Sequence, residues 1–163
     1  MLDFSSLYRQ YAPDVYRFAL YLSGDTTTAE DLTSETFVRL WTARDVRVAT
    51  VRAYLFAIVR NLYRHSLRTK RREASLDPTL PDPAPNAENS TSEKERLRWL
   101  MNRLLMLAEI DRAALLMRTQ HEMSYEEIAA SLNISLAAVK VRIHRAKLKL
   151  ARQWSEETRG SNS

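Results

Sequence analysis

Cations and small side chains share one face of the helix predicted at residues 136–151. With about 100° per residue, this face lies opposite an apolar stripe. The face and its flanks consist of Ala137, Ala138, Lys140, Val141, Arg142, His144, Arg145, Lys147 and Lys149. A duplex groove needs small residues where a helix enters, side chains that reach base edges, and cations beside the phosphates. The pattern therefore predicts a DNA-reading helix, and the alternative is an amphipathic helix with a solvated basic face.

Aromatic residues alternate with cations in a second helix, predicted at residues 51–72. The aromatic residues are Tyr54, Phe56 and Tyr63, and the cations include Arg60, Arg64, Arg68, Lys70, Arg71 and Arg72. Capture of a single strand needs cations that hold the backbone and rings that stack on unpaired bases. The alternative is that Tyr54 and Phe56 belong to the core and the cations form a solvated face.

The residues that most enzyme sites require are missing or scattered. His65, His121 and His144 lie far apart in the sequence without a carboxylate partner, and no cysteine occurs. Gly24 and Gly160 are the only glycines, too few for a phosphate-binding loop. We therefore expect neither catalysis, nor a cofactor, nor a metal site.

The DNA-reading helix needs a partner helix and a tight turn, and the sequence supplies both. Ser124 followed three residues later by Glu127 is a capping box, which starts a helix. Asn133 suits the left-handed turn at its end, and Ser135 can cap the following helix. Residues 124–151 are thus predicted to form a helix-turn-helix.

Two further helices are predicted near the N-terminus. The first spans residues 4–22, carries an apolar stripe, and is expected to kink or break at Pro13 before Gly24 ends it. Its aromatic residues are predicted to lie in the core. The second spans residues 28–41, is predicted to be capped at Thr28, and is amphipathic.

Charge and proline divide the chain. Residues 1–72 and 96–163 each carry a net charge of +5, whereas residues 73–95 carry −5. Four of the five prolines fall at positions 78, 81, 83 and 85. We expect an all-α chain with helical domains at 1–73 and 93–155, joined by a flexible, acidic, Pro-rich linker at 74–92, and a frayed tail after 155. No apolar run approaches the ~20 residues of a membrane span, so the expected location is the cytoplasm.

The segment SYEEIAASLNISLAAVKVRIHRAKLKL resembles region 4 of the extracytoplasmic-function sigma factors, which binds the −35 promoter element. Ala137 and Ala138 stand where the family usually has Gly-Thr, and Val141 where it has Ser. The stretch AEDLTSETF resembles region 2.2, which docks on the clamp coiled coil of RNA polymerase. The residues that this resemblance assigns to polymerase binding are Asp31, Leu32, Ser34, Glu35 and Val38.

The helix at 51–72 resembles regions 2.3 and 2.4, which open and read the −10 element. The residues carried over are Tyr54, Asn61, Arg64, His65, Arg68, Arg71 and Arg72, with Tyr54 in place of the usual Trp and His65 in place of Asp. The resemblance spans about residues 4–152 and implies an alternative sigma factor. Its expected partners are core RNA polymerase and promoter DNA, and members of the family are commonly held by an anti-sigma factor. The other hypothesis is a free-standing helix-turn-helix regulator that binds duplex DNA without polymerase.

Overall fold

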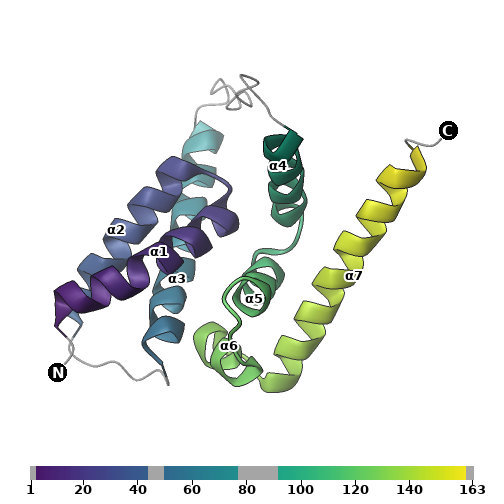
Figure 1. The fold of residues 1–163 in the computed structure, drawn as a ribbon. Helices are drawn as coiled ribbons and strands as arrows, with labels where there is room; N and C mark the ends of the chain where they lie inside the picture. Colours follow the sequence, from purple (N-terminus) through teal and green to yellow (C-terminus); the bar gives the residue numbers. More distant parts are fainter. Residues whose placement is uncertain (1–2, 44–49, 77–91, 161–163) are drawn as a thin grey trace.

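The computed structural model describes residues 3–43, 50–76 and 92–160, which form seven α-helices and no strand. The helices are α1 (Phe4–Ser23), α2 (Thr26–Thr42), α3 (Val51–Leu76), α4 (Ser92–Leu105), α5 (Glu109–Thr119), α6 (Tyr125–Leu132) and α7 (Leu136–Gly160). The all-α class is confirmed. Helices α1–α3 pack together, and α4–α7 form a second group beside them (Figure 1). Most of the predicted linker lies outside the described residues, although 74–76 belong to α3 and Ser92 begins α4.

A tight turn joins α1 to α2. Gly24 adopts the left-handed conformation at φ 73°, and its N–H donates to the Leu20 carbonyl at 2.7 Å. Asp25 then caps α2, since its carboxylate accepts from the backbone N–H of Thr28 at 3.0 Å and from the Thr28 hydroxyl at 2.6 Å. The prediction that Thr28 caps this helix was therefore wrong. The same two hydrogen bonds hold the pKa of the Asp25 carboxyl below its usual range.

Pro13 does not break α1; of the kink or break that the sequence predicted, the break does not occur. The helix continues through it from Phe4 to Ser23. Proline inside a helix costs about 3 kcal/mol, whereas each large apolar side chain that is fully buried contributes about 1.5–3 kcal/mol. Val15, Phe18 and Leu22 follow Pro13 and are completely buried. Their packing together outweighs the cost of the proline.

The helix α7 is longer than predicted. It extends to Gly160, beyond the expected end at 151 and through most of the tail that was expected to fray. Trp154 packs edge-on against Trp99 of α4, with ring centroids 5.3 Å apart. Glu157 accepts a hydrogen bond from the Trp99 indole and pairs with Arg103. Contacts with α4 therefore hold the last turns of α7.

The two groups of helices meet across a buried interface. Arg112 of α5 is 3% exposed, and its guanidinium donates to the carbonyls of Leu22 at 2.9 Å and Leu107 at 3.0 Å. Arg60 of α3 donates to both carboxylate oxygens of Glu109, at 2.7 and 3.0 Å. The buried apolar side chains form one cluster that includes residues of both groups. The division into two domains is not tested by these contacts and stays a prediction.

Candidate nucleic-acid interface

The helix-turn-helix has the local geometry that its sequence predicted. Ser124 accepts from the Glu127 N–H at 3.1 Å, and the Glu127 carboxylate accepts from the Ser124 N–H at 3.5 Å, which completes the capping box. Asn133 ends α6 in the left-handed conformation at φ 56°. Ser135 accepts from the Ala138 N–H at 3.1 Å and so caps α7. These caps set the angle at which α7 leaves α6.

The predicted DNA-reading face of α7 points to solvent. The opposite, inner face of α7 consists of Val139, Ile143 and Ala146, which are buried against the other helices. The seven exposed members of the predicted face are Ala137, Lys140, Val141, His144, Arg145, Lys147 and Lys149, and Ala138 and Arg142 are half-buried. Helical periodicity therefore gave the correct orientation of α7.

Four cations of this face make contacts within the protein. Lys140 Nζ lies 5.8 Å from the centroid of the Tyr125 ring, and the other three donate hydrogen bonds. Arg142 donates to Asp111 of α5 at 3.0 Å, and Arg145 donates to the same carboxylate at 3.3 and 3.4 Å. Lys149 donates to the backbone carbonyl of Met106 at 2.9 Å. Sequence reasoning missed Asp111, because it lies 31 and 34 residues from its two partners and no local pattern connects them.

The α3 helix separates its residues into two faces. The exposed residues among those assigned to the −10 element are Asn61, Arg64, His65, Arg68, Arg71 and Arg72, and Tyr54 is half-buried. Phe56 and Tyr63 are buried at 0% and 7% exposure, so these two rings belong to the core and are not placed to stack on bases. Arg60, also buried, pairs with Glu109. The alternative, which placed Tyr54 and Phe56 in the core, is correct for Phe56, whereas Tyr54 is only half-buried.

On α2, four of the five residues assigned to polymerase binding are exposed. Asp31, Ser34, Glu35 and Val38 lie on its outer face. Leu32 is 5% exposed and packs in the core, so its assignment to a surface contact was wrong. Amphipathic periodicity accounts for this, since Leu32 lies one turn from the buried Thr36 and on the same side.

Family comparisons match both halves of the chain. Residues 7–73 match the model of Sigma-70 region 2, and residues 97–150 match that of Sigma-70, region 4. The chain is 32% identical over 150 residues to the ECF RNA polymerase sigma factor SigL of Mycobacterium tuberculosis, with 86% of this chain and 82% of SigL covered. The chain belongs to the extracytoplasmic-function sigma factors. It is an alternative sigma factor that directs transcription initiation, and the free-standing regulator is not favoured.

Other relatives agree with this assignment. The sigma factor is 35% identical over 156 residues to the ECF RNA polymerase sigma factor SigE of Mycolicibacterium smegmatis, a match that covers 92% of this chain and 61% of SigE. Among solved structures, the sigma factor RpoE in complex with the anti-sigma factor NepR, from Bartonella quintana, has a TM-score of 0.76 and 24% identity. That match covers 94% of this chain and 97% of RpoE. The likeness to RpoE shows a shared fold.

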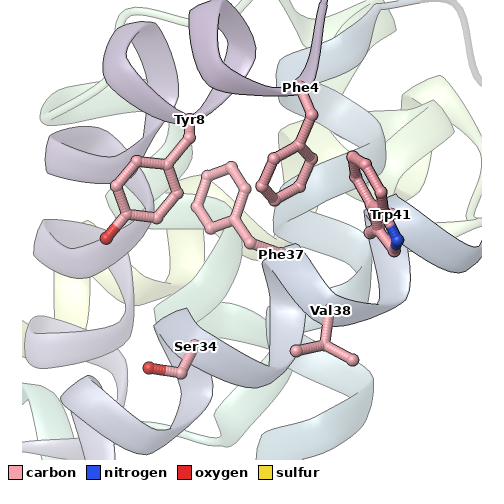
Figure 2. A pocket seen from close by; sticks show the side chains of 6 residues that line it. All are labelled: Phe4, Tyr8, Ser34, Phe37, Val38 and Trp41. Atoms are coloured by element: carbon pink, nitrogen blue, oxygen red, sulfur yellow. The ribbon is translucent and has the colours of Figure 1, made fainter.

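The sigma factor also carries an apolar patch that sequence reasoning missed. Phe4 and Tyr8 of α1 and Ser34, Phe37, Val38 and Trp41 of α2 line an open hollow of about 450 Å³ (Figure 2). Trp41 and Val38 are 66% and 61% exposed. The Phe4 ring packs edge-on against Trp41, with ring centroids 4.8 Å apart. The spacing 34, 37, 38 and 41 is one face of a helix, but the pairing with Phe4 depends on the antiparallel α1–α2 turn.

Two features are absent from the residues that the structure describes. None of the helices placed in the structure is long and apolar enough to cross a membrane. Within the same residues, no group of three or more His, Cys, Asp or Glu side chains could hold a metal ion.

Proposed function

We propose that three exposed helix faces divide the work of promoter-directed initiation. In this proposal α7 reads the −35 element, α3 opens and holds the −10 element, and α2 docks on core RNA polymerase. One observation carries the proposal. On each helix most of the residues assigned from the family motifs lie on the solvent side, with Leu32 of α2 as the buried exception, while the other side of the helix packs in the core.

The polymerase-binding surface of α2 consists of Asp31, Ser34, Glu35 and Val38 and extends over the apolar patch. Ser34 and Val38 belong to both sets, because they also line the hollow beside Trp41. A protein–protein contact commonly combines an apolar centre with a polar rim. The patch supplies the centre, and Asp31 and Glu35 supply acidic groups at the rim.

The sigma factor acts by binding and positioning, in the cytoplasm, and carries out no covalent chemistry. Its partners are core polymerase, promoter DNA and an anti-sigma factor. The anti-sigma factor is proposed because RpoE, which shares this fold, was solved with NepR. The chain is organised as domains 1–73 and 93–155, and limited proteolysis that first cuts between 74 and 92 would support this division.

The decisive experiment is run-off transcription with purified core polymerase and this protein on a library of genomic fragments. A defined set of new start sites should appear only when both components are present. Core polymerase alone and the protein alone are the controls. Tight binding of the isolated protein to a two-fold symmetric duplex, with no new start sites, would contradict the proposal and favour a free-standing regulator.

A further inference from the structure

Asp111 is a buried carboxylate behind the proposed DNA-reading helix. It lies in the first turn of α5, is 6% exposed, and faces α7, which packs on α5. A buried carboxylate is costly unless it is paired and hydrogen-bonded. The groups that satisfy Asp111 are two arginines one turn apart on α7, Arg142 and Arg145.

The contact with Arg145 uses one particular edge of the guanidinium. Asp111 Oδ2 accepts from Arg145 Nε at 3.3 Å, and Oδ1 accepts from Nη2 at 3.4 Å. A guanidinium has five N–H donors in one plane, and this edge uses two of them. The Nη1 and Nη2 ends keep the paired donors that match O6 and N7 of guanine.

The remaining donors of Arg145 are accessible. The side chain of Arg145 is 58% exposed, whereas that of Asp111 is 8% exposed and that of Arg142 is 31% exposed. Arg142 donates to Asp111 Oδ1 at 3.0 Å. The second cation leaves the cluster with a net positive charge, so that a buried carboxylate near the DNA does not repel the phosphates.

We propose that Asp111 is a positioning residue for promoter reading. It holds the Arg145 guanidinium by its Nε/Nη2 edge and thereby aims the Nη1/Nη2 end at a guanine of the −35 element. The inference rests on the proposed role of α7. Without the carboxylate, a long arginine side chain samples many rotamers and contacts phosphates of any sequence. Asp111 thus contributes to base discrimination without touching DNA.

The purely structural alternative is that Asp111 only ties α5 to α7. In that case its loss would weaken binding to every sequence in proportion to the loss of folded protein. In the positioning role, its loss lowers discrimination at the base that Arg145 reads. Binding to unrelated sequences stays the same or becomes tighter, since a negative charge has been removed.

The test measures binding of the holoenzyme, assembled from core polymerase and the full chain, to a series of −35 mutants of a promoter found by run-off transcription. Arg145→Ala should abolish a preference of roughly 5- to 150-fold at one or two positions. Asp111→Asn should lose most of the preference at the same positions, and the double variant should lose no more than Arg145→Ala alone. Glu126→Gln, which removes an exposed carboxylate of α6, is the matched control and should leave the preference unchanged.

Each result separates the two levels of the inference. If Arg145→Ala changes the preference and Asp111→Asn does not, or weakens all sequences equally, the role of Asp111 is overturned while α7 keeps its function. If Arg145→Ala leaves the preference unchanged, the proposed reading by α7 fails, and the inference with it. Should Asp111→Asn not fold by circular dichroism, Asp111→Leu with Arg142→Leu replaces the ion pair by apolar side chains. That variant should show the same loss at the position read by Arg145.

Discussion

His121 is a polar side chain buried between two aromatic rings. It is 6% exposed, and its ring lies 4.7 Å from Phe56 and 6.0 Å from Phe18, edge-on to both. Its Nε2 atom has no hydrogen-bond partner among the described residues. Burial lowers the pKa of His121 to about 4, with Arg17 and Arg52 adding to the shift and Asp14 opposing it. The imidazole is therefore neutral in the folded protein at pH 7.

This burial predicts that acid weakens the fold through His121. The unfolded chain binds a proton near pH 6.5 and the folded chain only near pH 4, so stability is complete above pH 6.5 and falls as the pH drops toward 4. Between pH 7.5 and 5 the loss should be roughly 2 kcal/mol. Urea denaturation at both pH values, compared with His121→Leu, isolates this contribution.

The control for this measurement is His144→Leu, since His144 is exposed on α7. It should follow the pH dependence of the unmodified protein. An identical pH dependence in His121→Leu and in the unmodified protein would show that the imidazole stays neutral in both states or charges in both.

At Asn61, the prediction concerns strand opening. Asn61 is exposed on the same side of α3 as Arg64 and His65. The Asn61→Ala protein should form holoenzyme normally, yet give little permanganate reactivity at unpaired thymines of the −10 region. Asn102→Ala, an exposed position on α4, is the matched control. Normal opening with Asn61→Ala would reduce Asn61 to a surface polar residue.

Caps and turns that depend on neighbouring residues were predictable from the sequence, whereas contacts between residues far apart in the sequence were not. The capping box of Ser124 and Glu127 and the left-handed turn at Asn133 depend only on neighbours within a few positions, and the sequence predicted them. The pairing of Asp111 with Arg145 depends on how α5 packs against α7. From the sequence alone, every arginine on an exposed helix face is expected to be solvated, so nothing singles out Arg145 as a partner of Asp111.

Among the elements, α2 carries the prediction for polymerase binding. Asp31 and Glu35 are exposed one turn apart, and their two carboxylates, one of which pairs with Arg39 at 3.9 Å, leave this stretch of the outer face with a net negative charge. Asp31→Lys with Glu35→Lys reverses that charge and should abolish co-purification with core polymerase, while helicity by circular dichroism is unchanged. Glu93→Lys with Glu156→Lys makes the same change in net charge on α4 and α7 and should co-purify normally. Unchanged binding by the α2 variant would remove the acidic face from the contact.

Element boundaries were predictable where a local signal marks them. Gly24 gave the end of α1, whereas the start of α2 was placed late because the cap at Asp25 competes with a similar signal at Thr28. The continuation of α1 through Pro13 and of α7 to Gly160 depends on tertiary packing. At both places tertiary packing outweighs helix propensity, through the buried Phe18 in α1 and through the Trp99–Trp154 contact in α7.

At the scale of the whole molecule, the Arg60–Glu109 pair joins the two groups of helices. Both side chains are largely buried, at 10% and 18% exposure. Removing one partner leaves the other charge buried, at a cost of up to about 3–5 kcal/mol where no water can enter. Arg60→Leu should therefore lower the urea midpoint markedly.

The double variant Arg60→Leu with Glu109→Leu should recover much of this loss, because no charge remains buried. Arg64→Leu, an exposed arginine one turn along α3, is the control and should change the midpoint little. Equal losses in the single and double variants would mean that the pair is not coupled across the interface.

The interface shares α3 with the proposed −10 surface, and the two occupy adjacent faces of one helix. Ala53 accepts a hydrogen bond from Ser131 at 2.8 Å within the interface, while Asn61, farther along α3, is exposed. Suppose core polymerase engages only molecules whose halves have separated. The apparent Kd of core polymerase for this protein is then the intrinsic Kd divided by the fraction of molecules whose halves have separated. That fraction falls about tenfold for each 1.4 kcal/mol of docking free energy. A substitution such as Ser131→Ala, remote from both DNA and polymerase, would then set how much of a given cellular amount of the protein can initiate transcription.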